Sequence, residues 1–400
     1  MEPKIRIEGI GNWTTKLLSD ISKKVLTKNT ALKYDVTLTN SAEFGIISQL
    51  DFFDHKISND KSISNYYVVE PDDFVYNPRV SVTAPVGPIN RNMLGFSGVM
   101  SPLYYVFKVH DVDKEFLDYY FHTRCWHKFM YDKGNCGARF DRLSISDSEF
   151  VKMPISMPKS EDEQRSIASF FRNLDDLISA SNSKIASLRQ LKVASQQAMF
   201  PQKGETRPRV RFKGFEDEYS SMTANELFKT FDERNHPELP VLSACQDIRG
   251  MAPRSESGYD IFHDKSNEVT YKRVLPGQFV IHLRSFQGGF AHSSVEGICS
   301  PAYTVFGFKE DDKHDDYYWK YIFMSKAFID RLKLITYGIR DGRSISFKEF
   351  MEMNFVFPSY EEQKQISIFF RTIDKQISLE EQKLESLKRI KSACLDKMFV

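Results

Sequence analysis

The stretch that begins at Glu163 reads EQRSIASFFRNLD (residues 163–175), and residues 362–374 repeat it as EQKQISIFFRTID. The chain has 400 residues, so the two copies are separated by half of its length. A chain that repeats itself in this way consists of two equivalent units, and each unit is expected to bind an equivalent target. The repeat therefore predicts a target in two parts.

The repetition extends upstream of these stretches. Residues 143–150 (LSISDSEF) correspond to residues 343–350 (RSISFKEF), and residues 98–107 (GVMSPLYYVF) correspond to residues 297–306 (GICSPAYTVF). Between these blocks the two halves diverge. A common framework with different loops favours one scaffold that carries two different specificities; the alternative is an old duplication without a functional division.

Composition limits the classes of protein that this chain can belong to. A hydrophobic fraction of 41% with 33 phenylalanines indicates packed globular units rather than disorder. No apolar run approaches the roughly 18 to 20 residues of a membrane span, and the five scattered cysteines are typical of reduced thiols, so we expect a cytoplasmic protein. The net charge of +1 provides no general attraction to nucleic acid, and any such contact must come from local patches.

Each repeated stretch begins with the pattern of a helix start. Ser160 with Glu163, and Ser359 with Glu362, fit a capping box, in which the hydroxyl and the carboxylate bind free backbone N–H groups. Apolar residues then recur at spacings of three and four, which places one stripe along each helix. The stripes are interrupted at matched positions by Ser181 and Glu380 and by Lys192 and Lys391, and these polar residues indicate either register control or docking of another protein.

A helix of about 38 residues is roughly 57 Å long, and nothing local can cover a stripe of that length. We predict that the two helices pack against each other as an antiparallel coiled coil, because the second globular unit must turn the chain around. The alternative is that each helix lies along its own domain. The predicted seam residues are Ile167, Phe171, Leu174, Ile178, Ile185 and Leu188 in the first helix, and Ile366, Phe370, Ile373, Ile377, Leu384 and Leu387 in the second.

The remaining segments combine short alternating apolar runs, which are typical of strands, with a few helical patterns. The sequence therefore predicts a mixed α/β protein with two similar globular domains, related by the internal repeat and separated by the two long helices. The predicted boundaries are residues 1–158 and 207–358 for the globular domains, 159–206 for the central helical region with its linker, and 359–400 for the C-terminal helical region.

No sequence motif of catalysis is found. The chain has no phosphate-binding loop, no dinucleotide-binding glycine motif, and no Asn/Asp-Pro-Pro-Tyr/Phe motif of amino-methyltransferases. His122, Cys125, His127 and Cys136 are close in sequence, but their spacing fits no zinc site well and the second half has no counterpart. We therefore expect a chain that is not an enzyme and that binds no metal.

Candidate nucleic-acid contacts are basic, amide and hydroxyl side chains in predicted loops, since these residue types bind phosphates and read base edges. Basic residues recur just before Leu143-Ser144 in the first half and just before Ser344-Ile345 in the second. For any single residue, a solvated surface charge remains the alternative. The candidates are Asn77, Arg79, Arg91, Asn92, Arg139 and Arg142 in the first half, and His282, Arg284, Gln287, Arg340, Arg343 and Ser344 in the second.

Together these motifs make the chain similar, over nearly all of its length, to the specificity subunit of type I restriction–modification systems. The resemblance rests on the helix motif at residues 163–172 and 362–371 and on the Ser-Pro-x-Tyr block at residues 101–104 and 300–303. It implies two target-recognition domains that each read one part of a split site on double-stranded DNA. It also implies helical regions that bind two modification subunits.

The resemblance further implies that other subunits carry the chemistry. In that family the complex methylates adenine with S-adenosylmethionine and cleaves DNA with ATP and Mg²⁺, so no cofactor is expected on this chain. The recognition loops match no family pattern, and base-reading residues cannot be carried over. The sequence leaves open whether a restriction subunit joins. The main alternative function is a two-domain protein-interaction scaffold clamped by a coiled coil, without nucleic acid; a fused nuclease is disfavoured by the missing motifs.

Overall fold

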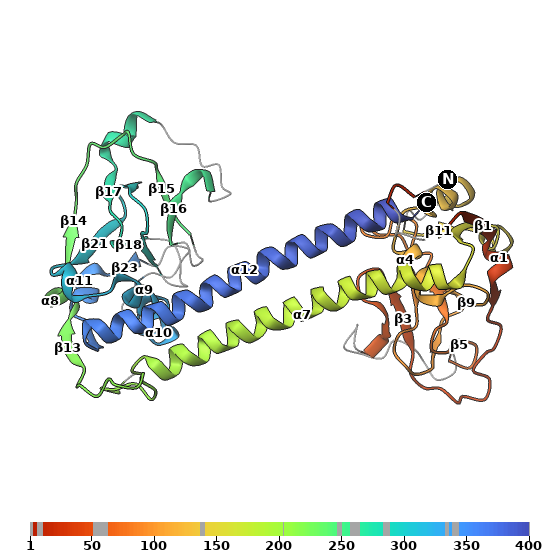
Figure 1. Ribbon diagram of the computed structural model, residues 1–400, viewed down its shortest axis with the longest axis horizontal. Coiled ribbons are helices and arrows are strands. Elements are labelled where there is room, and N and C mark those ends of the chain that lie inside the picture. Colours follow the sequence, from red (N-terminus) through yellow and green to blue (C-terminus); the bar gives the residue numbers. More distant parts are fainter. Residues whose placement is uncertain are drawn as a thin grey trace. The chain divides into compact units, whose positions relative to one another are not determined.

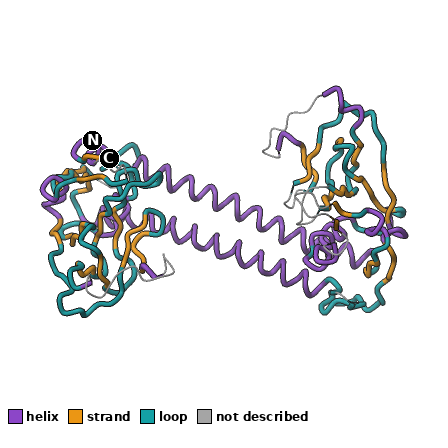
Figure 2. The backbone as a smooth tube through the Cα atoms, turned by 180° about the vertical axis from the view of Figure 1, so that it is seen from behind, coloured by secondary structure: helices purple, strands orange, loops and turns teal. Residues whose placement is uncertain are grey.

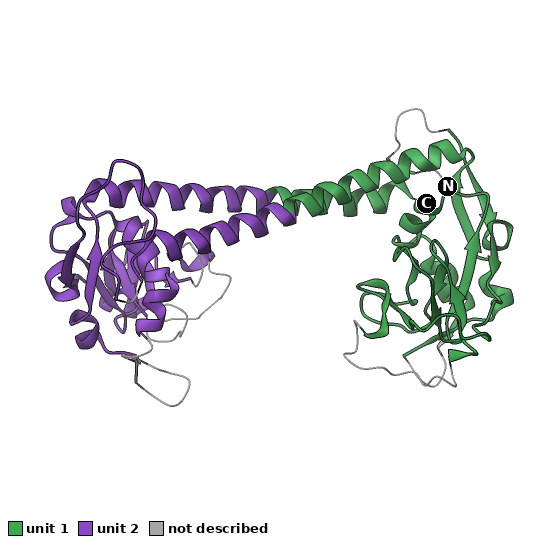
Figure 3. Cartoon of the chain, turned by 90° about the horizontal axis from the view of Figure 1, so that it is seen from below, with its two compact units in different colours: residues 1–181, 383–400 green, residues 182–382 purple. Residues whose placement is uncertain are grey.

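The computed structural model describes residues 3–5, 11–50, 63–136, 141–202, 204–245, 250–256, 265–282, 289–332, 336–337 and 344–399. The chain divides into two compact units (Figure 3). Unit 1 contains Met1–Ser181 and Lys383–Val400, and unit 2 contains Asn182–Gln382. Each unit therefore combines one globular half with parts of both long helices, a division different from the predicted domain boundaries, which stay a prediction.

The globular half of unit 1 contains short strands and helices in an order that leads into the first long helix (Figure 1). A four-stranded antiparallel sheet of order β2-β9-β6-β7 forms its centre. The elements are β1 (Trp13–Leu17), α1 (Leu18–Ile21), β2 (Ser22–Lys24), β3 (Leu38–Ser41), β4 (Gly45–Ser48), β5 (Tyr67–Val69), β6 (Phe74–Tyr76), β7 (Ile89–Arg91), β8 (Gly98–Met100), β9 (Tyr105–Val109), α4 (Lys114–Phe121), α5 (His127–Lys133), β10 (Asn135–Cys136), β11 (Leu143–Ser144), α6 (Asp147–Phe150), β12 (Pro154–Pro158) and α7 (Glu161–Met199).

Unit 2 repeats this arrangement. Its four-stranded antiparallel sheet has the order β14-β21-β18-β19, and β13 pairs with β24 as β1 pairs with β12. Its elements are β13 (Ser220–Thr223), α8 (Ala224–Leu227), β14 (Phe228–Phe231), β15 (Leu242–Ala244), β16 (Met251–Pro253), β17 (Lys272–Val274), β18 (Phe279–Ile281), β19 (Phe290–His292), β20 (Gly297–Cys299), β21 (Thr304–Phe308), α9 (Asp316–Met324), α10 (Lys326–Leu332), β22 (Thr336–Tyr337), β23 (Ser344–Ile345), α11 (Phe347–Met351), β24 (Asn354–Phe357) and α12 (Tyr360–Met398), with short 3-10 turns at Arg254–Glu256, Lys265–Thr270 and Asp311–Lys313.

The cores of the two halves are built from equivalent aromatic pairs. Phe74 stacks on Phe107 with ring centroids 5.6 Å apart, and Phe279 stacks on Phe306 at 5.5 Å. These rings are fully buried, and each comes from the repeated strands of the central sheet. The predicted mixed α/β class and internal repeat are confirmed.

The repeated helix motif anchors each long helix to its own globular half. The side chain of Gln164 accepts a hydrogen bond from the backbone N–H of Asp113 (2.8 Å) and donates to the carbonyl of Pro158 (2.9 Å). Gln363 makes the same two contacts, with Asp315 (3.1 Å) and with the carbonyl of Pro358 (2.9 Å). Since Asp113 and Asp315 cap α4 and α9, each glutamine joins a long helix to the start of a short one.

The two motif glutamates make contacts that the capping-box interpretation did not anticipate. The carboxylate of Glu163 accepts a hydrogen bond from the backbone N–H of Gly11 (2.9 Å). Glu362 is fully buried and forms a two-pronged ion pair with Arg211 (3.0 and 2.7 Å). In both units the glutamate therefore ties the helix start to the segment that precedes the first strand.

The helices α7 and α12 lie side by side and antiparallel (Figures 1 and 2). Within unit 2, Lys184 of α7 binds Glu380 of α12 at 2.8 Å, and Lys192 binds Asp374 at 2.6 Å, so a later residue of one helix meets an earlier residue of the other. The predicted antiparallel coiled coil is confirmed.

The lysines that interrupt the apolar stripes take part in a repeated three-residue contact, which we call the lysine–aspartate–tyrosine lock. In unit 2, Asp374 accepts hydrogen bonds from Lys192 (2.6 Å) and from the hydroxyl of Tyr321 (2.7 Å). The ammonium of Lys192 also lies 5.4 Å from the centre of the Tyr321 ring. Burial and the hydrogen bond to Asp374 raise the pKa of Tyr321, which keeps its hydroxyl a donor.

Unit 1 contains the same lock with the roles of the helices exchanged. Asp175 of α7 accepts from Lys391 of α12 (2.5 Å) and from the hydroxyl of Tyr119 (2.9 Å). Lys391 lies 5.5 Å from the centre of the Tyr119 ring. In each unit the aspartate is the last residue of the repeated motif, the tyrosine comes from the globular half, and the lysine comes from the other long helix. These contacts fit register control, one of the two predictions for the polar seam positions; docking of another protein stays a prediction as well.

The far end of each long helix completes the core of the other globular half. Phe399, which follows α12, packs in unit 1 against Phe116 (5.3 Å) and Phe171 (5.6 Å). Phe200, which follows α7, packs in unit 2 against Phe370 (5.5 Å) and Tyr318 (5.6 Å). The backbone hydrogen bonds at these helix ends correspond as well. The N–H of Ile5 donates to the carbonyl of Lys397, and the N–H of Val210 donates to the carbonyl of Ala198.

The predicted seam residues lie in two environments. Those in the first turns, such as Ile167 in α7 and Phe370 in α12, belong to the globular cores as well as to the helix pair. At its start, each long helix therefore packs along its own globular half, as the alternative prediction stated. Of the remaining seam residues, Leu174, Ile185 and Ile373 are buried, whereas Ile178, Leu188, Ile377, Leu384 and Leu387 are half-buried.

We expect Lys192→Met to lower the free energy of unfolding by about 3 kcal/mol. The substitution removes the ammonium group and leaves the carboxylate of Asp374 buried without its counter-charge. The side chains of Lys192 and Asp374 are only 14% and 11% exposed. Arg189→Met is the matched control, since Arg189 and Glu381 are 65% and 45% exposed, and it should cost less than about 1 kcal/mol. Chemical denaturation followed by circular dichroism measures both; equal losses would contradict the assignment of the lock.

Candidate nucleic-acid interface

Arg79 and Arg142 form the best-placed cationic pair among the predicted contacts. Their backbones face each other in an isolated antiparallel bridge, which is flanked by hydrogen bonds from Val80 to Asp141 (3.0 Å) and from Leu143 to Pro78 (2.9 Å). Side chains directly opposite in such a bridge point to the same side. Both arginines are exposed, and neither forms an ion pair with a carboxylate of the described residues. Two adjacent guanidinium groups repel each other and together favour a bound phosphate.

A cavity of about 250 Å³ lies beside this pair, and both repeated sequence blocks line it. Leu103 and Tyr104 come from the Ser-Pro-x-Tyr block, and Arg142 with Leu143 and Ser144 comes from the block that precedes α6. Leu103 is 61% exposed. A cation, an aromatic ring and an exposed apolar side chain at one edge can contact phosphate, base edge and thymine methyl. Sequence reasoning noted both blocks but did not predict that they meet.

Three of the other candidates in the first half are engaged in the fold. Asn77 donates to the carbonyl of Asn40 (2.8 Å), and the buried Asn92 donates to the carbonyls of Glu70 (3.0 Å) and Phe96 (3.1 Å). Arg91, whose side chain is 14% exposed, binds Asp72. Burial alone would raise the pKa of Asp72, but the hydrogen bonds from Arg91 and Lys114 outweigh it and lower that pKa. In this structure, Asn77, Arg91 and Asn92 hold loops in shape.

In the second half, fewer candidates can be placed. His282 is half-buried next to Tyr303, with ring centroids 6.2 Å apart, and burial lowers the pKa of His282, so the ring is neutral at pH 7. It is therefore suited to a neutral hydrogen bond rather than to phosphate. Ser344 pairs through its backbone with Tyr337, as Ser144 pairs with Asn135 in the first half. Arg139, Arg284, Gln287, Arg340 and Arg343 lie outside the described residues.

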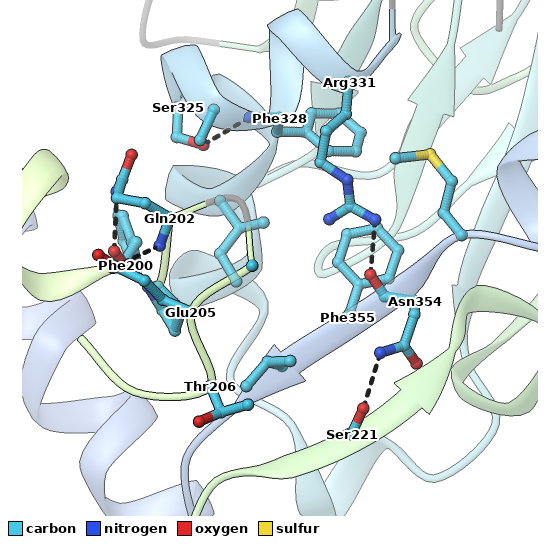
Figure 4. Close-up of a pocket in the computed structure, with 16 residues that line it drawn as sticks. Phe200, Gln202, Glu205, Thr206, Ser221, Ser325, Phe328, Arg331, Asn354 and Phe355 are labelled. Carbon is cyan, nitrogen blue, oxygen red and sulfur yellow. Dashed lines mark hydrogen bonds between the residues drawn. The ribbon is translucent and has the colours of Figure 1, made fainter. Parts of the chain in front are cut away.

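A second cavity, of about 570 Å³, lies in unit 2 where the linker after α7 meets α9, α10 and β24 (Figure 4). Arg331 donates to the carbonyl of Asn354 (2.6 Å) and covers the ring of Phe355 at 5.3 Å, and burial lowers the pKa of Arg331. The linker folds on itself, since Gln202 donates to the carbonyl of Phe200 (2.8 Å) and to the carboxylate of Glu205 (3.0 Å). The described linker residues Gln202 and Glu205 thus contact each other and line this cavity of unit 2.

Within the described residues, no three or more His, Cys, Asp or Glu side chains are grouped so that they could hold a metal ion. In the same part of the chain, no helix has the length and apolar character that a membrane crossing requires.

Comparison with known proteins relates the chain to one family. Residues 221–389 match the family described as "Type I restriction modification DNA specificity domain". No curated protein matches the chain.

Solved structures of similar fold cover the whole chain. The type I restriction-modification S subunit from M. genitalium has 13% sequence identity and a TM-score of 0.54, with 100% of this chain and 99% of that chain covered. The HsdS subunit from Thermoanaerobacter tengcongensis has 14% identity and a TM-score of 0.51, covering 97% and 96%. A chain from a structure on complex assembly and conformational transition of the type I R-M system has 14% identity and a TM-score of 0.53, covering 98% and 99%. At these identities the likeness shows the fold.

We expect the double variant Arg79→Ala/Arg142→Ala to weaken DNA binding for all sequences alike and to reduce the salt dependence of binding by about two counterions, because both side chains are assigned to phosphates. Fluorescence anisotropy of a labelled duplex over a range of salt concentrations measures this. The exposed Arg124 in the same half provides the control Arg124→Ala, which should leave the slope unchanged. An unchanged slope in the double variant would remove the pair from the interface.

Proposed function

We propose that the chain is a specificity subunit of a type I restriction–modification system and that it reads a bipartite, asymmetric DNA site with one half-site for each globular half. The observation that carries the proposal is the repeat itself. Two units share sheet order, aromatic core and helix anchoring, while the loops between the shared blocks differ. Equal frames with unequal loops fit a site whose two parts have different sequences.

The long helices are proposed to set the distance between the half-sites. Each has 39 residues, roughly 58 Å, which is longer than one DNA turn of about 34 Å. Lys192 follows Asp175 in α7 by the same number of residues as Lys391 follows Asp374 in α12. The two locks therefore agree on one register of the helix pair, which suits a fixed spacer.

The same helices are proposed to dock modification subunits. Large apolar side chains remain exposed along them, beyond those that face the helix pair. Leu191 and Ile390 occupy equivalent positions in the two helices, and each is 48% exposed. Exposed apolar positions that recur in a repeat indicate a protein interface rather than chance. The others on these helices are Leu177, Val193, Ile368 and Leu379.

The division of labour in the complex follows from this proposal. The chain supplies recognition and assembly without catalysis of its own, and it works on double-stranded DNA together with two modification subunits. S-adenosylmethionine, ATP and Mg²⁺ would then be bound by partner subunits. The scaffold alternative, without nucleic acid, gains no support, since the matched family is described by DNA specificity.

Inserting four residues after Ser181 and four after the equivalent Glu380 should lengthen the spacer by about one to two base pairs, because four helical residues add roughly 6 Å. Both helices must be extended, since an insertion in only one would set the two locks out of register. Mapping of methylated adenines across a genome measures the spacer. The single insertion after Ser181 is the control and should destabilise the protein; a paired insertion that left the spacer unchanged would refute the helices as a ruler.

Exchanging residues 1–158 for the corresponding domain of another specificity subunit should change one half-site and leave the other intact, because each unit has its own core and loops. The same methylation map provides the readout, with the wild-type strain as reference. Changes in both half-sites would contradict one domain per half-site, and the absence of any methylated motif in the wild type would contradict DNA specificity itself.

A further inference from the structure

An open cleft of about 470 Å³ lies on unit 2, between α9 and the first turns of α12. Lys320 and Tyr321 line it from α9, and Ile368, Arg371 and Lys375 line it from α12. Ile368 is 54% exposed at this surface, and Arg371 and Lys375 are exposed as well. The cleft thus combines an uncovered apolar side chain with several cations.

The positive charge of this cleft exceeds what its own carboxylate can balance. Asp374, which also lines the cleft, is already bound by Lys192 and Tyr321 in the lock. The guanidinium of Arg371 lies 4.1 Å from the centre of the Tyr317 ring. Burial lowers the pKa of Lys320, the carboxylates of Asp374 and Asp316 raise it, and Lys192 and Arg371 lower it, so several cations are crowded at this cleft. A negatively charged ligand relieves such crowding.

The equivalent surface of unit 1 has the opposite charge. The matched hydrogen bonds of Gln164 and Gln363 align α4 with α9, so Asp118 corresponds to Lys320, and the repeated motif aligns Asp176 with Lys375. Arg172 corresponds to Arg371, but it is bound by Glu115 of α4. Unit 1 therefore has carboxylates at two positions where unit 2 has cations: Asp176 is exposed, and Asp118 is half-buried next to Arg91 and His122.

This reversal argues against DNA as the ligand of the cleft. The two units repeat the same frame, so a surface that faces DNA in one unit would face DNA in the other. The carboxylates of Asp118 and Asp176 would then lie against phosphates, which repel them. The exposed Ile368 adds an apolar contact that a phosphate backbone does not use. A protein segment with carboxylates and an apolar side chain fits both properties.

We propose that the cleft formed by Lys320, Ile368, Arg371 and Lys375 docks an acidic segment of a modification subunit, with an apolar side chain of that segment placed on Ile368. This inference rests on the proposed function, since it takes the modification subunit as the partner. The acidic surface of unit 1 repels the same segment. Two copies of one modification subunit are therefore held unequally, and the copy at unit 2 depends more strongly on salt.

The test uses the full chain together with a modification subunit from the same organism, and native mass spectrometry counts the subunits bound. Lys375→Glu is expected to weaken the copy at unit 2 roughly tenfold at about 0.1 M salt and hardly at all at about 1 M, where the screening length falls from about 10 Å to about 3 Å. Lys348→Glu is the matched control, because Lys348 is exposed on α11 outside the cleft. Thermal unfolding verifies that both variants fold like the wild type.

The reverse substitution in unit 1 provides a gain of binding. Asp176→Lys gives unit 1 the charge of its counterpart, so it should raise the share of complexes that carry two modification subunits. An unchanged count with Lys375→Glu, or an equal loss with Lys348→Glu, would overturn the inference and leave the proposed function standing.

Other occupants produce other results. Lost DNA affinity with an unchanged subunit count would assign the cleft to DNA, and a wild-type dimer that Lys375→Glu dissociates would assign it to a second copy of the chain; either result overturns the inference. A wild-type chain that bound no modification subunit would overturn the proposed function together with it.

Discussion

The structure depends on an aspartate at the end of each repeated motif, which is buried in unit 2 and half-buried in unit 1. Asp374 in unit 2 and Asp175 in unit 1 each receive a lysine from the other long helix and a tyrosine hydroxyl from the globular half. A carboxylate in such a position is costly unless both partners are present, so only one register of the two helices satisfies it. Apolar contacts alone tolerate a slip by one heptad, because leucine and isoleucine fit many neighbouring positions. The polar contact therefore supplies specificity, and the apolar stripe supplies most of the stability.

The end of each long helix packs into the core of the other globular half, so the boundary between the compact units does not coincide with the ends of the globular segments. Phe399 fills the aromatic core around Phe116 and Phe171, and Phe200 fills the one around Tyr318 and Phe370. Removal of a large ring from such a core costs about 3 to 5 kcal/mol. Each globular half thus owes part of its core to the helix that begins in the other half. The compact units accordingly divide within the helices, and not at the ends of the globular segments.

Periodicity and repetition in the sequence were enough to predict the class, the repeat and the antiparallel helix pair. They were not enough to assign roles to single polar residues. Asn77 and Asn92 have the side chains that read base edges, yet their amides bind backbone carbonyls, because irregular loops need donors that strands would otherwise provide. Glu163 and Glu362 fit a local cap but bind residues about 150 positions away. Such contacts join segments that only the fold brings together. The contacts of Lys192 and Lys391, which interrupt the apolar stripes, could be assigned only from the fold, because the tyrosines near them lie far away in the sequence.

The net charge of the sequence likewise does not predict the charge of single surfaces. A total of +1 suggests a surface without preference, but the total does not describe local surfaces such as the basic cleft in unit 2. Opposite charges at equivalent positions mean that the duplication preserved the backbone contacts and the locks while the exposed faces diverged. Positions inside the lock are constrained by their mutual contacts, whereas Lys375 and Asp176 are exposed and free to differ. Because the constraint is local, a duplicated frame can acquire unequal exposed surfaces as readily as unequal loops, and the two units then differ in their surfaces rather than in their fold.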